Sequence, residues 1–245
     1  MILHCSRHPR WLSNSWLIAD QNSRQAVVID SGADTDEIDL LVADNDLELR
    51  YVLCTHHHYD HVANNQHYRQ QHRCQVCSHR NESNLIDGEV VGLEDNQVLK
   101  VGDIEIQCLH VPGHTSGQLA FLVNERKLFT GDTLFAGSVG GTKGPDHTSF
   151  SDLRHSILEI ICSLPPSTEI FPGHMEPSTI GYELQNNPFL RAWQGIDKPA
   201  LRDCTVDGEP YKLLLRAADY DGGTKCWVQA SNGTMDVIAG SKVID

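Results

Sequence analysis

The feature that most constrains this chain is a short stretch, residues 55–61, with the sequence Thr-His-His-His-Tyr-Asp-His. It places four histidines and one aspartate directly after an apolar run, residues 51–54, and such a run is typical of a buried strand. Imidazole is the commonest metal ligand in proteins, and carboxylate oxygens suit the harder divalent ions. A strand that ends in this cluster predicts one half of a metal site.

Three further strand-like runs end in a similar way: residues 104–111, 128–130 and 169–171. In each case a glycine precedes a histidine or an aspartate, and glycine lets the backbone turn sharply off the end of a strand. If these strand ends meet at one edge of a sheet, they gather seven candidate ligands: His56, His58, Asp60, His61, His114, Asp132 and His174. That set is large enough for two metal ions that share one carboxylate.

The order and intervals of these residues resemble those of the metallo-β-lactamase superfamily. Within that superfamily, residues 55–61, 112–117, 130–135 and 172–174 are similar to the hydroxyacylglutathione hydrolase (glyoxalase II) branch. The alternation of strands and helices along the chain fits this resemblance. The resemblance implies an α+β fold, the four-layer αββα sandwich, in which two mixed sheets pack face to face with helices outside.

The resemblance also implies a ligand set: His56, His58 and His114 for one ion, Asp60, His61 and His174 for a second, and Asp132 as the bridge. Nitrogen and oxygen donors without thiolate suit zinc, which we expect first, with iron or manganese as alternatives. Two such ions acidify a bridging water, so that hydroxide forms near neutral pH. The implied enzyme is a binuclear metallohydrolase that directs this hydroxide at a thioester carbonyl, with Asp60 as the catalytic residue that orients it.

Asp30 is a further candidate, because it ends the second strand of a predicted hairpin, residues 16–20 and 25–30, at the same sheet edge. It either orients a ligand loop beneath the metals or closes a turn with the residues that follow it.

Lys143 is the candidate substrate-binding residue, in the loop that follows Asp132. Glyoxalase II enzymes usually carry a basic residue in this loop, where the present chain has Gly140-Gly141, and a tyrosine after the last histidine, where it has Met175-Glu176. These departures leave recognition of glutathione open. A lactone or another ester is the alternative substrate class.

Three other functions are compatible with the same fold. Persulfide dioxygenases use one iron, and the complete set of second-metal residues argues against that activity. A non-catalytic binding module would be expected to have lost ligands, whereas this chain retains all seven. A β-lactamase role is disfavoured because those enzymes act outside the cytoplasm and no export signal is visible.

The chain is expected to divide into a hydrolase domain, residues 1–195, and a C-terminal appendage, residues 196–245. The sequence of the appendage predicts three strands joined by glycine-containing turns: residues 211–217, 225–230 and 235–239. A helical glutathione-binding domain is not predicted. Because so small a sheet is marginally stable alone, we expect it to pack on the main domain or on a second copy of the chain as a homo-oligomer.

The composition of the chain limits the classes of molecule that it is expected to bind. The formal net charge of −14 over 245 residues argues against a nucleic acid, whose phosphates require a basic surface. No apolar run is long enough for a membrane span. With nucleic acids and membranes both disfavoured, a small molecule is the expected partner. The eight cysteines are interpreted as reduced thiols in a cytoplasmic protein, and Cys74 and Cys77 as ordinary thiols on opposite faces of one strand.

Overall fold

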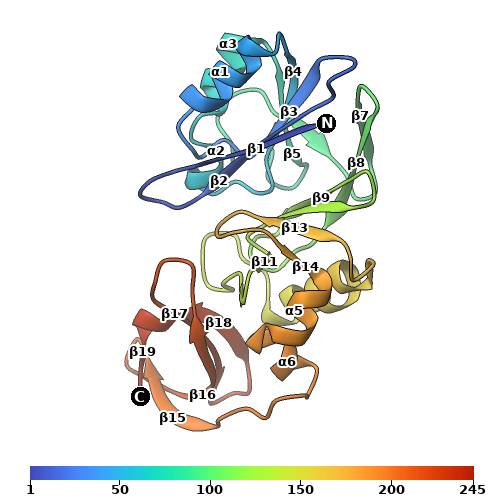
Figure 1. Cartoon of the computed structure of the whole chain (residues 1–245). Helices are drawn as coiled ribbons and strands as arrows, with labels where there is room; N and C mark the ends of the chain where they lie inside the picture. The colour runs from blue at the N-terminus through green and yellow to red at the C-terminus, as the bar shows by residue number, and fades with distance from the viewer.

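The computed structural model describes residues 1–245 and contains two six-stranded sheets, a two-stranded hairpin and a five-stranded C-terminal sheet. Figure 1 shows the N-terminal sheet at the top, the second sheet across the middle and the C-terminal sheet at the bottom. None of the helices combines the length and the apolar character that a membrane crossing needs.

The first sheet has the strand order β1-β2-β3-β4-β5-β6. Its strands are β1 (Ile2–Arg7), β2 (Asn14–Ala19), β3 (Gln25–Ile29), β4 (Glu48–Leu53), β5 (Gln75–His79) and β6 (Val91–Leu93). The strands β1 to β3 are antiparallel, with β2 and β3 forming the predicted hairpin, and β3 to β6 are parallel. Parallel neighbours need crossovers. The helix α1 (Asp36–Asp44) lies between β3 and β4, α3 (Asn65–His72) lies between β4 and β5, and a non-helical segment, residues 80–90, connects β5 to β6.

The second sheet has the strand order β14-β13-β10-β9-β8-β7. Its strands are β7 (Val98–Val101), β8 (Ile104–His110), β9 (Leu119–Val123), β10 (Lys127–Gly131), β13 (Glu169–Pro172) and β14 (Ser178–Thr179). Only β10 and β13 are parallel neighbours in it. The short hairpin of β11 (Leu134–Phe135) and β12 (Ser138–Val139) follows β10.

Alternation along the strands creates the layers, because successive side chains point to opposite faces of a sheet. On β2, Ile18 joins the apolar cluster between the sheets, which also contains Phe121 and Phe129. Its neighbour Leu17 joins the cluster under the helices, which contains Ile38 of α1. The predicted four-layer arrangement is therefore confirmed.

The helices on the far side of the second sheet are α4 (Phe150–His155), α5 (Ile180–Asn186) and α6 (Pro188–Trp193). Ser149 caps α4 by accepting a hydrogen bond from the backbone N of Asp152. The helix continues as a π-helical turn (Ser156–Ile160) and a 3-10 turn (Ile161–Ser163). Pro188 does more than stop α5, since it is the first residue of α6.

The C-terminal sheet has the strand order β18-β17-β16-β15-β19. The three predicted strands are β16 (Glu209–Ala218), β17 (Thr224–Ala230) and β18 (Met235–Ala239), and β15 (Arg202–Val206) and β19 (Val243–Ile244) were not predicted. The sheet packs on the main body through Leu214, Trp227 and Val237. A division into two domains at residue 195, and self-association through this sheet, stay predictions.

The two cysteines of residues 74–77 behave as expected of ordinary thiols. Both are free. Cys77 lies in the apolar cluster between the sheets, whereas Cys74 lies in the cluster beneath α1 and α3.

Candidate metal centre

The first part of the centre is the loop between β4 and α2 (Tyr59–Val62). Thr55 fixes the start of this loop, because its backbone N and its Oγ1 donate to the two carboxylate oxygens of Asp30, at 2.7 and 2.8 Å. The loop then turns into α2, whose first residues carry Asp60 and His61. A single short segment therefore presents His56, His58, Asp60 and His61 together.

The second part comes from the ends of β8, β10 and β13, which lead to His114, Asp132 and His174. Since β10 and β13 are parallel neighbours, Asp132 and His174 leave the same edge side by side. The backbone N of Gly173 donates to the carbonyl oxygen of Gly131 at 2.9 Å. A Cβ on Gly173 would lie 2.4 Å from Asp132 Oδ1, so this glycine permits the close approach.

All seven predicted residues converge. His58 Nδ1 lies 3.0 Å from His114 Nε2, and His61 Nε2 lies 3.4 Å from Asp132 Oδ1. The nearest oxygens of Asp60 and Asp132 are each 3.5 Å from His174 Nε2. Their donor atoms form three groups that could each hold an ion, with the atoms of each group within 4.8 Å of one another: His56, His58 and His114; His56, His61 and Asp132; and Asp60, His61 and His174.

Buried polar atoms without a partner mark the middle of the centre. They are His56 Nε2, His61 Nε2, His174 Nε2 and Asp132 Oδ1. Leaving such a group unpaired costs about 1–3 kcal/mol or more, and a coordinated cation would remove that cost. Nitrogen and carboxylate donors that face one another in this way fit divalent metal ions.

The opposite ring nitrogens of most of these histidines are held by other groups. Thr55 Oγ1 lies 3.0 Å from His56 Nδ1, Asp30 Oδ2 lies 2.9 Å from His61 Nδ1, and the carbonyl oxygen of Gly141 lies 2.9 Å from His114 Nδ1. Each contact leaves Nε2 directed at the centre. Asp30 thus contacts a candidate ligand and also turns the chain, with a left-handed φ of 56°.

The electrostatics differ between the two sides of the centre. Burial lowers the pKa of His56 and His58, and lowers that of His114 to about 4, so these rings are neutral at pH 7. Burial also opposes protonation of His61, but the carboxylates of Asp132 and Asp30 outweigh it and raise its pKa to about 10. The rings of His56, His58 and His114 therefore offer free lone pairs, whereas His61 carries a proton that a bound cation would replace.

Glu82 is a buried group of the site that the sequence did not reveal. It lies in the turn after β5 with its side chain fully buried. Its Oε2 accepts from the backbone N of His57 at 2.9 Å and lies 2.9 Å from His57 Nδ1, and its Oε1 accepts from the backbone N of Gly117 at 2.6 Å. Glu82 therefore ties the loop that carries His56 to the loop that follows His114. Its own local sequence carries no signal of this position.

Tyr220 is a second residue that sequence reasoning missed. It lies between β16 and β17, and its ring stacks on that of His174, with centroids 4.0 Å apart and planes 9° apart. Burial raises the pKa of its hydroxyl, and the carboxylates of Asp132 and Asp60 raise it further. The C-terminal sheet therefore reaches the centre.

Lys143 points to the C-terminal sheet. Its Nζ lies 3.1 Å from Tyr211 Oη and 3.3 Å from Asp236 Oδ2, and its role as a substrate-binding residue stays a prediction. Position 140 requires glycine for a steric reason, because a Cβ there would lie 1.9 Å from the carbonyl oxygen of Asp132. No side chain fits at that position.

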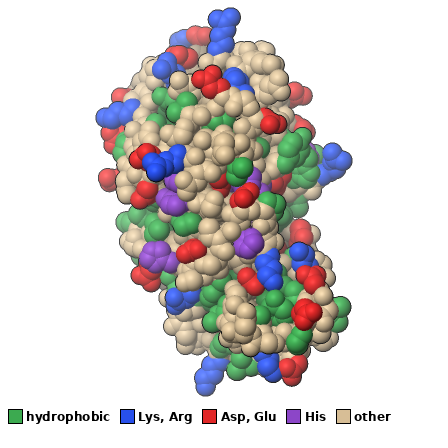
Figure 2. Space-filling view, turned by 180° about the vertical axis from the view of Figure 1, so that it is seen from behind, with side chains coloured by type: hydrophobic (Ala, Val, Ile, Leu, Met, Phe, Trp, Pro, Cys, Tyr) green, Lys and Arg blue, Asp and Glu red, His purple; other side chains and the backbone are tan.

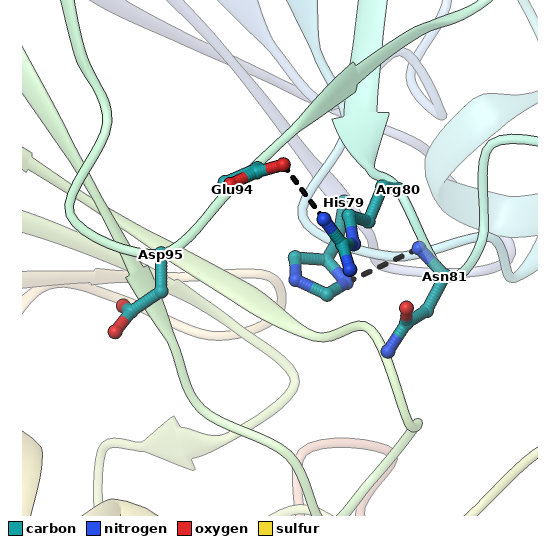
Figure 3. A pocket seen from close by; sticks show the side chains of 5 residues that line it. All are labelled: His79, Arg80, Asn81, Glu94 and Asp95. Atoms are coloured by element: carbon teal, nitrogen blue, oxygen red, sulfur yellow. Dashed lines mark hydrogen bonds and ion pairs between the residues drawn. The ribbon is translucent and has the colours of Figure 1, made fainter.

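Two other polar clusters have their groups satisfied internally. Asp39 accepts from both His67 and His72, at 2.7 Å each. The pocket in Figure 3 is lined by His79, Arg80, Asn81, Glu94 and Asp95. There Arg80 pairs with Glu94 at 2.7 Å, and Asp95 accepts from the backbone N of His110. Histidine side chains also gather across the middle of the face shown in Figure 2.

Comparison with known proteins agrees with this geometry. The model of the metallo-beta-lactamase superfamily matches residues 8–174. A hydroxyacylglutathione hydrolase from Pelagibacter ubique is 34% identical over 179 residues, which cover 73% of this chain and 70% of that protein. The probable polyketide biosynthesis zinc-dependent hydrolase BaeB from Bacillus velezensis is 30% identical over 184 residues, covering 73% and 80%.

Among solved structures, the di-iron-bound form of TTHA1623 is similar, with a TM-score of 0.68 and 29% identity, over 76% of this chain and all of that one. The family match spans the four loops that carry the candidate ligands. The chain belongs to the metallo-β-lactamase superfamily.

Proposed function

We propose that the protein is a metal-dependent thioester hydrolase of the hydroxyacylglutathione hydrolase type. In this proposal the ligands are His56, His58 and His114 for one divalent ion, Asp60, His61 and His174 for a second, and Asp132 between them. The observation that carries it is the set of buried, unpartnered donor atoms from separate strand ends that face one another. A protein without metal would leave these atoms buried and unsatisfied.

Zinc is the proposed metal, and iron and manganese are the alternatives that the donor set allows. The relative BaeB is named a zinc-dependent hydrolase, whereas TTHA1623 was solved in a di-iron-bound form. When bound, the ions would lower the pKa of a coordinated water and polarise the carbonyl group of the substrate.

The protein's own groups would orient the reactants. Asp60 has a side chain that is 31% exposed, against 9% for Asp132, so Asp60 is the carboxylate of the centre that faces solvent. It is the proposed catalytic residue, and it would accept a hydrogen bond from the attacking water. Asp30 and the carbonyl of Gly141 hold the rings of His61 and His114 from behind, which keeps the centre preorganised.

The names of several relatives support a thioester as the substrate, because they are hydroxyacylglutathione hydrolases at about 30% identity. The identity of the thiol in that thioester depends on other residues. Gly140 admits no basic side chain, and Lys143 contacts the C-terminal sheet. A thioester of a smaller thiol, or a lactone, is therefore the second candidate.

The test compares three substrates on the full chain with bound zinc: S-D-lactoylglutathione, the same acyl group on N-acetylcysteamine, and a simple lactone. We expect both thioesters to be hydrolysed, with kcat/KM of at least about 10⁴ M⁻¹s⁻¹ for one of them. Turnover of the lactone alone would replace the thioester with an ester substrate. Turnover of none would refute the proposed function.

Asp60→Asn supplies the matched variant in the same assay. It should lower kcat by about 100-fold or more, because the residue both binds metal and orients the water. Asp87→Asn, an exposed aspartate in the turn after β5, controls for the loss of a charge and should leave the rate unchanged.

A further inference from the structure

His174 differs from the other candidate ligand histidines in how its ring is held. The rings of His56, His61 and His114 each have a hydrogen-bond partner on the nitrogen that faces away from the centre. His58 has one as well, the carbonyl oxygen of Pro145, at 3.3 Å from Nε2. By contrast, both ring nitrogens of His174 are buried without a partner. No hydrogen bond within the protein fixes the rotation of this ring.

The contact that His174 does have is aromatic. Tyr220 stacks on one face of the imidazole, with centroids 4.0 Å apart and planes 9° apart, and Phe135 meets the ring edge-on at 5.8 Å. Tyr220 and Phe135 also contact each other, at 5.7 Å. A parallel ring at this distance restricts rotation of the imidazole about its side-chain bonds.

Tyr220 is itself held in place by the residues on either side of it. Asp219 pairs with Lys225 at 2.9 Å, and these side chains are only 4% and 10% exposed. The other carboxylate oxygen of Asp219 accepts from Ser138 Oγ at 3.0 Å. Ser138 belongs to β12, in the hairpin that follows Asp132. The turn that carries Tyr220 is therefore fixed to the main body through a buried polar network.

A second contact ties the same sheet to the opposite side of the centre. The backbone N of Thr142 donates to the carbonyl oxygen of Val237 in β18 at 2.8 Å, and the backbone N of Val237 donates to Thr142 Oγ1 at 2.9 Å. Gly141, the preceding residue, provides the carbonyl that holds His114. The C-terminal sheet thus supports one candidate ligand by stacking and another through the backbone.

We infer that the C-terminal sheet is part of the metal centre, and that Tyr220 is the positioning residue of His174. Its ring takes the place of the hydrogen bond that orients each of the other histidines. This inference rests on the ligand assignment of the proposed function, but not on the identity of the substrate. It gives residues 196–245 a role beyond covering apolar surface.

The experiment is a metal titration of the full chain, with Co²⁺ as the probe and the visible spectrum as the readout. Loss of a group that orients a metal-bound histidine weakens metal affinity by about 10- to 100-fold. We expect Tyr220→Ala to show this loss for one of two Co²⁺ ions, with an altered band shape. Tyr220→Phe keeps the stacking plane and should bind both ions like the wild type.

Tyr220→Leu distinguishes ring stacking from simple packing, because leucine keeps much of the side-chain volume but lacks the planar aromatic ring. It should resemble Tyr220→Ala in affinity while retaining the melting temperature of the wild type. Tyr182→Ala, which removes an exposed tyrosine of α5, is the control and should change neither readout.

Two results would overturn the inference. One is wild-type affinity for both ions in Tyr220→Ala and Tyr220→Leu. The other is an equal loss in Tyr220→Phe, which would assign the effect to the hydroxyl. A wild-type chain that binds two ions but hydrolyses no thioester would refute the proposed substrate and leave this titration valid.

Discussion

The metal-bearing strand ends and the C-terminal sheet reach the same centre by different routes. At the strand ends, four candidate ligands follow β4 and the other three follow β8, β10 and β13, so the edges of two facing sheets bring them together. Tyr220 belongs instead to a turn whose position depends on Asp219, Lys225 and Ser138. The first arrangement is encoded locally, and the second depends on tertiary packing. Substitutions in each region can show whether the two really differ in this way.

Asp132→Ala should have the largest effect. The carboxylate of Asp132 lies within 3.6 Å of His61, His114 and His174, so it touches both proposed metal positions. We expect the loss of at least one metal ion per chain and a fall in thioester hydrolysis of more than about 100-fold. Elemental analysis and kcat/KM on one sample would measure both. Full metal content with near-normal activity would contradict the two-metal assignment.

Lys225→Ala tests whether the buried ion pair with Asp219 holds the C-terminal sheet in place. Removing one partner of a buried ion pair leaves the other charge unpaired and typically costs about 3–5 kcal/mol of unfolding free energy. The double variant Asp219→Asn with Lys225→Met removes both charges and should recover part of this loss. Lys100→Ala breaks an exposed pair with Glu105 and should change the melting temperature little. If Lys225→Ala behaves like Lys100→Ala, the buried network does not fix the turn.

Glu82→Gln tests a contact between two of the metal-bearing loops. Burial opposes ionisation of Glu82, but hydrogen bonds from His57 and Gly117 outweigh it and hold its pKa below the ordinary value of 4.5. A lowered pKa stabilises the folded state above that ordinary value, and this contribution is lost as the pH falls through the folded-state pKa. We expect Glu82→Gln to cost about 1–3 kcal/mol at pH 7.

The pH dependence gives the sharper readout for Glu82. The stability difference between the wild type and Glu82→Gln should shrink as the pH falls below 4.5 in urea unfolding, because the wild type gains a proton there. Glu105→Gln, at an exposed site, should show no such convergence. A difference that stays constant over this range would mean that ionised Glu82 is not what joins the loops.

Lys143→Met should have the smallest effect. The ammonium contacts Tyr211 and Asp236, and the lysine side chain is 34% exposed, so its loss should lower the melting temperature slightly. We expect KM for the thioester to change less than about twofold. An increase in KM of about tenfold or more would instead support the substrate-binding role that the sequence predicted.

The part of the site that sequence reasoning predicted has a common physical origin. His56, His114, Asp132 and His174 each follow an apolar run within a few residues, so the strand period and the glycine turns place them together. Asp30 was a candidate for the same reason. The αββα layers followed from the resemblance and from alternation along strands such as β2, whose side chains enter two different cores.

The rest depends on contacts between distant segments. Glu82 lies in a turn with no strand pattern, and only the packing of that turn brings it to His57 and Gly117. The strands β1 and β15 were missed because polar residues interrupt their apolar pattern. Tyr220 follows a strand that was predicted, but no local pattern indicates which part of the main domain its turn will contact.

The two-metal centre is tested by a titration of the metal-free protein with zinc, in which bound metal and thioester hydrolysis are measured on the same samples. We expect the metal-free protein to be inactive and the activity to rise with bound zinc until about two ions per chain are held. Full activity in the metal-free protein, or saturation of the activity at one ion, would contradict a two-metal centre built from these strand ends.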